Sequence, residues 1–88
     1  MLYTIGHREN YERFFREQRQ PMKLGRGPHP RNPGEEYPGG SIYLTREEAE
    51  AAAPDGYTSY GVETTIENTY LVGADRHLIE TSPLVRLP

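Results

Sequence analysis

The chain has 88 residues, no cysteine and a formal net charge of −3 at pH 7. This length is near the smallest at which one core stabilises a fold, so residues 1–88 are expected to form a single domain. The absence of cysteine excludes disulfides and thiol nucleophiles and favours a reducing, cytoplasmic location. The first ten residues lack the pattern of a secretory leader, and no stretch approaches a span of 18 apolar residues, so we expect no membrane association.

The apolar content is low for a folded chain of this size. Leu, Ile, Val and Phe account for 16 of the 88 residues, but seven tyrosines add large rings whose hydroxyls can stay at a polar edge. We therefore expect a thin core rimmed by phenols. Such rims suit ligand pockets or contacts between identical chains, so a homo-oligomer is expected.

Charge is distributed unevenly along the sequence. Residues 1–34 hold seven Lys or Arg against three Glu, whereas residues 35–88 hold three Arg against ten Asp or Glu. This division predicts either a patch that attracts anions or an attraction between the two halves of the fold. The overall acidity argues against nonspecific nucleic-acid binding, which requires a broad basic face.

The first predicted elements are a short strand over residues 3–5 and a helix over residues 8–19. Gly6 separates the two, and Pro21 ends the helix. Aromatic residues recur along one helical face. On the other side Glu9 precedes Arg13 by four residues, and Glu12 precedes Arg16 by four residues. That spacing predicts local ion pairs along the helix.

Residues 25–40 form a long loop, because five glycines and four prolines in sixteen residues prevent both helical and strand hydrogen bonding. Loops longer than about 12–15 residues inside a compact domain usually bind a ligand, act as a lid or lack fixed structure. Lys23 and Arg26 lie beside glycines, a combination that can hold a phosphate or carboxylate. A binding loop, a mobile surface loop and a segment ordered by oligomer contacts remain open.

Residues 41–56 carry the most definite local signals. Residues 41–44 alternate as a strand, and Thr45 with Glu48 forms a capping box that starts a helix. Alanines then give this helix a smooth face for close packing on a sheet. The sequence Pro-Asp-Gly at residues 54–56 ends it.

Strands are predicted over residues 57–65 and 66–72, followed by a turn at 73–75. Residues 77–80 are ambiguous between a helical turn and a bend, and residues 83–88 predict a terminal strand whose prolines place it at a sheet edge. The predicted fold class is α+β. It has a small, largely antiparallel sheet of four or five strands, two helices packed on one face, and one long Gly/Pro-rich loop.

The predicted binding residues are cations in or beside the loop and tyrosines that follow it. The cations would meet anionic groups of a ligand, and the tyrosine rings would hold a base or another flat ring by stacking. These residues are Lys23, Arg26, Arg31, Tyr37, Tyr43 and Tyr60. Tyr43 and Tyr60 also fit a second interpretation, as core residues with their hydroxyls at the rim.

No pattern predicts a metal site, a cofactor or a catalytic residue. His7, His29 and His77 lack the paired spacing of metal ligands, and no serine lies in a nucleophile elbow.

One family resemblance follows from the order "LYTIGH", "GGSIYLTREEAEAA" and a glutamate after a strand. This order resembles that of His-Tyr-Glu ADP-ribosyltransferases, although the Gly-Thr or Gly-Ser that usually follows the histidine is missing. The resemblance implies that His7 and Tyr43 would hold a nicotinamide nucleotide and that Glu63 would polarise the ribose.

Three functional hypotheses follow. The leading one is a small non-enzymatic protein that captures an anionic, nucleotide-like molecule between the loop and a tyrosine-lined sheet, analogous to phage proteins that sequester signalling nucleotides. The second is an acidic inhibitor or adaptor of phage or mobile-element type that binds a basic protein surface. The third is a minimal ADP-ribosyltransferase-like enzyme.

Overall fold

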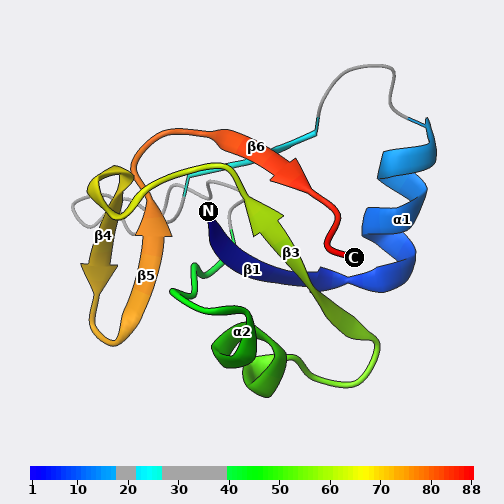
Figure 1. Cartoon of the computed structure of the whole chain (residues 1–88), viewed down its shortest axis with the longest axis horizontal. Helices are drawn as coiled ribbons and strands as arrows, with labels where there is room; N and C mark the ends of the chain where they lie inside the picture. The colour runs from blue at the N-terminus through cyan, green and yellow to red at the C-terminus, as the bar shows by residue number, and fades with distance from the viewer. Residues whose placement is uncertain (18–21, 27–39) are drawn as a thin grey trace, which may run out of the picture.

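The protein combines two helices with two antiparallel sheets (Figure 1). The computed structural model describes residues 1–17, 22–26 and 40–88. The four-stranded sheet has the order β1 (Leu2–His7), β3 (Tyr57–Val62), β6 (Ser82–Val85) and β2 (Lys23–Leu24). The other elements are α1 (Arg8–Glu17), α2 (Arg46–Ala52), the 3₁₀ turn η1 (Ile66–Asn68), and the paired strands β4 (Thr69–Val72) and β5 (Asp75–Leu78). The predicted small, largely antiparallel α+β fold is confirmed.

A two-residue bridge joins the two sheets. Tyr43 exchanges backbone hydrogen bonds of 3.0 and 2.7 Å with Tyr3 of β1, and the Ile42 N–H donates to the Arg76 carbonyl of β5 at 2.8 Å. The Thr4 hydroxyl, which is buried, donates to the Ser41 carbonyl at 2.8 Å. The predicted strand over residues 41–44 is therefore reduced to this bridge, which holds the β4–β5 hairpin to the main sheet.

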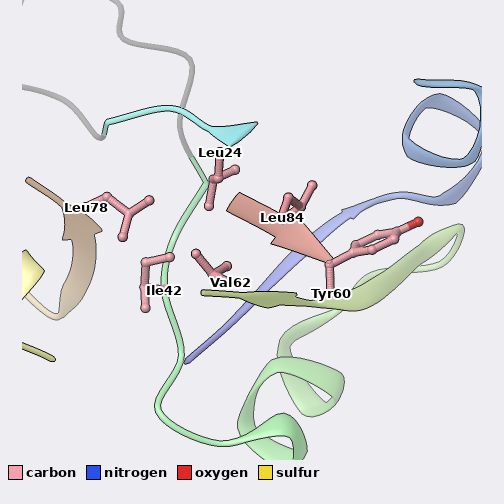
Figure 2. Close-up of a cluster of buried hydrophobic side chains, with 6 residues drawn as sticks. All are labelled: Leu24, Ile42, Tyr60, Val62, Leu78 and Leu84. Carbon is pink, nitrogen blue, oxygen red and sulfur yellow. The ribbon is translucent and has the colours of Figure 1, made fainter. Parts of the chain in front are cut away.

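The core is small and draws its buried residues from β2, β3, β5, β6 and the bridge (Figure 2). Its buried members are Leu24, Ile42, Tyr60, Val62, Leu78 and Leu84. Four partly buried residues pack around them, namely Leu2, Tyr11, Phe15 and Met22. Tyr60 is the only aromatic residue in the buried cluster of the described chain, and its ring closes the end of the core that faces α1.

The two helices contact neighbouring residues of β3. Tyr60 packs against Tyr11 and Phe15 of α1 at ring-centroid distances of 4.9 and 5.8 Å. The adjacent Ser59 hydroxyl donates to the Glu50 carboxylate of α2 at 3.4 Å. Because successive residues of a strand point to opposite faces, α1 and α2 contact opposite sides of β3. The α+β class holds, but the expectation that both helices pack on one face does not, because neighbouring residues of β3 contact different helices.

Local capping explains where α2 begins. The Thr45 hydroxyl accepts a hydrogen bond from the Glu48 N–H at 3.1 Å, as the capping box predicted. Ala49 is fully buried one turn later, so the helix approaches the sheet closely there.

The prediction that the last strand lies at a sheet edge is wrong, because β6 lies between β3 and β2. Pro83 lacks an N–H group, but its carbonyl accepts from the Glu63 N–H at 2.9 Å. The next residue, Leu84, donates its N–H to the Met22 carbonyl at 2.8 Å. A proline is tolerated inside this sheet because each neighbouring pairing is only two residues long and none requires a donor at Pro83.

The β4–β5 hairpin closes through a two-residue turn. Gly73 has a φ of +61°, and among the described residues no residue other than glycine has a positive φ. Glycine at the first central position with a negative φ at Ala74 is the pattern of a type II′ turn. The predicted turn at residues 73–75 is confirmed, and the ambiguous residues after it are divided between β5 and a bend.

We expect Gly6→Ala to lower the free energy of unfolding by about 1–3 kcal/mol, because a Cβ at Gly6 would overlap the Tyr11 ring. Urea denaturation measures the change. In a Tyr11→Ala background the same substitution should cost much less, because the two residues share one contact. Equal costs in both backgrounds would contradict this account.

Candidate functional site

The predicted binding residues that the structure describes do not share one hollow. Arg31 and Tyr37 lie outside the described residues. Lys23, Tyr43 and Tyr60 line three different hollows of the described surface.

The hollow beside Lys23 lies between α1 and β2 and has a volume of about 440 Å³. Tyr11 and Phe14 of the helix line it, together with Gly25 and Gly40 at the two ends of the predicted loop. Its lining therefore carries Lys23 as its single cation among the described residues. Arg26, also predicted to bind, is exposed and does not line this hollow.

The hollow beside Tyr43 has a volume of about 240 Å³ and lies between the start of α2 and the β4–β5 hairpin. Its lining mixes apolar residues such as Leu44 and Leu71 with three charged residues, Glu48, Asp75 and Arg76. The Arg76 guanidinium already donates to the Thr69 hydroxyl at 2.7 Å, which holds it along the hairpin.

The pocket at Tyr60 is the candidate functional site, because it combines several charged groups with a buried polar atom. Its volume is about 180 Å³. The lining residues are Arg8, Glu12, Thr58, Ser59, Tyr60, Arg86 and Leu87. We call it the Tyr60 pocket.

Three chain segments meet at the Tyr60 pocket. β1 leads directly into α1, so Arg8 and Glu12 lie one helical turn apart on the same side of the helix. β3 carries Tyr60 past this turn, and the residues that follow β6 bring Arg86 to it. Figure 1 shows the C-terminal segment between the sheet and α1.

The Tyr60 hydroxyl is buried without a well-formed hydrogen bond. The residue is 2% exposed, and its hydroxyl lies close enough to the Glu12 carboxylate to interact with it, although the pair does not reach good hydrogen-bond geometry. Figure 2 shows the hydroxyl pointing away from the aliphatic side chains of the core. A buried polar group that is poorly satisfied costs free energy, so a bound molecule that offers better geometry would compete with Glu12 for this hydroxyl.

The guanidinium of Arg86 is held in two ways. Its Nη2 atom is 2.8 Å from Glu12 Oε2, and the group lies over the Phe15 ring at 5.0 Å from the centroid. The side chains of Arg86 and Glu12 are 51% and 36% exposed, and ion pairs this accessible contribute at most about 1 kcal/mol. A ligand can therefore compete for either partner at small cost.

The Arg8 side chain forms no ion pair with any described residue. Its backbone N–H donates to the Gly56 carbonyl at 2.9 Å, which fixes the start of α1 against the turn before β3. The pocket thus carries two positive charges and one negative charge.

Burial raises the pKa of the Tyr60 phenol above its ordinary value of 10.0, and the Glu12 carboxylate raises it further by its charge and by a weak hydrogen bond from the phenol, whereas Arg8 acts in the opposite direction. Both charged groups therefore act on the hydroxyl. Burial also raises the pKa of Tyr11, with a smaller contribution from Tyr57.

Sequence reasoning included Tyr60 but missed Arg8, Glu12 and Arg86. Glu12 was assigned to a local ion pair with Arg16 on the same helix, whereas the structure pairs it with Arg86 at the other end of the chain. One signal was present, because Arg8 has no acidic residue four positions before it in the sequence.

The residues of the ADP-ribosyltransferase resemblance are not brought together. His7 pairs with Tyr57 at one end of the β1–β3 ladder, whereas Glu63 follows Val62, which pairs with Leu2 at the other end. Five residues of strand separate these ends, a distance of about 16 Å. One nicotinamide nucleotide would not place its nicotinamide at His7 and its adjoining ribose at Glu63, so the described geometry gives the enzyme hypothesis no support.

No group of three or more His, Asp or Glu side chains in the described ranges is arranged to hold a metal ion. None of the described helices has the length and apolar character needed to cross a membrane. No family model matches the chain, and no curated protein or solved structure matches it significantly.

We expect Tyr60→Phe to raise the free energy of unfolding by about 1 kcal/mol in the absence of ligand, because it removes a buried hydroxyl whose contact with Glu12 is too poorly formed to offset its desolvation. Chemical denaturation of the two proteins measures the difference. Tyr57→Phe serves as the control, because that ring is 40% exposed and its change should stay within about 0.5 kcal/mol. A loss of stability specific to Tyr60→Phe would show that the hydroxyl has a partner in solution.

Stability should fall as the pH rises above 10. Below that value the two phenols are protonated in both the folded and the unfolded chain. Above it the unfolded chain releases these protons first, because the pKa values of Tyr11 and Tyr60 are raised in the folded state. Denaturation between pH 8 and about pH 11 should therefore show a loss that is smaller in Tyr11→Phe and in Tyr60→Phe. If either variant lost as much stability as the unchanged protein over this pH range, the assignment of the loss to that tyrosine would be contradicted.

Proposed function

We propose that this chain is a small non-enzymatic binding protein that captures a molecule by its carboxylate or phosphate group in the Tyr60 pocket. The observation that carries the proposal is the buried, poorly satisfied Tyr60 hydroxyl, in a pocket that also holds the accessible Arg86 and Arg8, which forms no ion pair with a described residue. Guanidinium groups and a phenol are donors well suited to an anionic oxygen.

The volume of the pocket limits what it holds. Pockets for drug-sized ligands are about 300–1,000 Å³, whereas the Tyr60 pocket has about 180 Å³. It therefore takes a small molecule or the charged end of a larger one. A nucleotide-like ligand is compatible with the proposal only if its base lies outside this pocket.

The expectations about location, protein partners, oligomeric state and a phage-type role are still predictions. The absence of cysteine supports a cytoplasmic location. Binding to a basic protein surface is supported by the exposed carboxylates of α2, Glu47 and Glu48, which lie on the acidic half of the chain. A homo-oligomer and a phage-type sequestering role rest on composition and analogy.

The experiment follows the amide resonances of the protein while acetate, inorganic phosphate or alanine is added. A ligand of the Tyr60 pocket should shift the resonances of Arg8, Tyr60 and Arg86 in a saturable way. It should also stabilise the fold, by about 2.7 kcal/mol at a hundredfold excess over Kd.

Arg8→Met should weaken this binding about tenfold, because it removes one charged hydrogen-bonding group. Arg13→Met is the matched control, since Arg13 is an exposed arginine of the same helix that does not line the pocket. Equal losses in both variants would point to a general effect of charge and overturn the proposed site.

A further inference from the structure

The negative charge in the Tyr60 pocket restricts the kind of anion that fits. Glu12 Oε2 is only 2.8 Å from the Arg86 guanidinium. An anionic oxygen bound to Arg86 must therefore lie close to the Glu12 carboxylate, and two like charges at such a distance repel each other. A simple anion gains from Arg8 and Arg86 but loses part of that gain to Glu12.

The same carboxylate becomes favourable if the ligand also carries a positive charge. Arg86 contacts one oxygen of Glu12 and the Tyr60 hydroxyl lies near the same carboxylate, which has acceptor positions on both oxygens. An ammonium group placed beside Glu12 would take the positions that these two groups leave open. The Tyr60 hydroxyl can donate to an anionic oxygen or accept from an ammonium, so it suits either end of such a ligand.

Size points in the same direction. The pocket volume of about 180 Å³ lies below the range of about 300–1,000 Å³ for pockets that hold drug-sized ligands. A small ligand with a carboxylate, an ammonium and few carbon atoms between them suits such a volume.

We propose that the Tyr60 pocket selects a small zwitterion of the α-amino acid type, with its carboxylate at Arg8 and Arg86 and its ammonium at Glu12. This inference rests on the proposed function, and it adds the class of ligand and the residue that selects it. Glu12 then acts as the specificity determinant: it attracts the ammonium group and repels phosphates and simple carboxylates.

The test compares alanine with N-acetylalanine, which keeps the carboxylate but has no positive charge. Amide-resonance titrations of the full chain give both dissociation constants. Alanine should bind about tenfold more tightly, as expected for one charge-assisted hydrogen bond. In Glu12→Gln this preference should disappear, because the amide that replaces the carboxylate is of similar size and carries no charge.

Glu9→Gln is the control, since Glu9 is exposed on the same helix and does not line the pocket. It should leave the preference for alanine unchanged. The amide spectrum of each variant shows whether the fold is retained, and a variant that unfolds is replaced by Glu12→Ala.

The outcomes separate the two proposals. If N-acetylalanine, acetate or phosphate shifts the pocket resonances at least as strongly as alanine, the zwitterion inference is overturned and the anion site stands. If none of these four compounds shifts the pocket resonances, both proposals are overturned. A preference for alanine that survives in Glu12→Gln would remove Glu12 from its assigned role.

Discussion

The contact between Gly6 and the Tyr11 ring determines how α1 meets the sheet. The helix has no fully buried residue, so its attachment depends on partly buried aromatic rings. Tyr11 can lie over β1 only because Gly6 has no side chain, and from there its ring reaches Tyr60 at 4.9 Å. A larger residue at Gly6 would push the helix outward. Arg8 and Glu12 belong to the same two turns, so the geometry of the pocket depends on this glycine.

Tyr60 serves both the core and the pocket. Its ring is part of the buried cluster, where it contributes apolar area that a chain with few aliphatic residues needs. Its hydroxyl, in contrast, is buried at the end of that cluster beside Glu12 without a well-formed hydrogen bond. A phenylalanine would supply the same packing without the buried hydroxyl. The hydroxyl therefore contributes little to stability, which supports the proposal that it contacts a bound molecule.

Local signals in the sequence predicted local structure well. Thr45 and Glu48 predicted the start of α2, and glycine before Ala74 predicted the hairpin turn, because each depends on a few neighbouring residues. The place of β6 was not predictable in this way. It depends on which strands flank it, and the rule that keeps proline at edges failed because no neighbour needs a donor at Pro83.

The site shows the same division between local and distant information. Tyr60 was predicted because an aromatic residue on an alternating strand is visible in sequence. The pairing of Glu12 with Arg86 was not, since these residues come from opposite ends of the chain and meet only after the sheet has formed. Before folding, a glutamate four residues ahead of an arginine is better explained by a helical ion pair.

The charge of the whole chain also bears on what the pocket binds. A net charge of −3 opposes the approach of a free anion, although at physiological salt this repulsion fades beyond a Debye length of about 8 Å. The net negative charge of the chain therefore repels an anion as it approaches the surface, and the Glu12 carboxylate repels it again inside the pocket. A zwitterion has no net charge and escapes the first repulsion, and its ammonium group converts the second into an attraction. An acidic protein with a mixed-charge pocket is thus better suited to a neutral molecule with separated charges than to a phosphate.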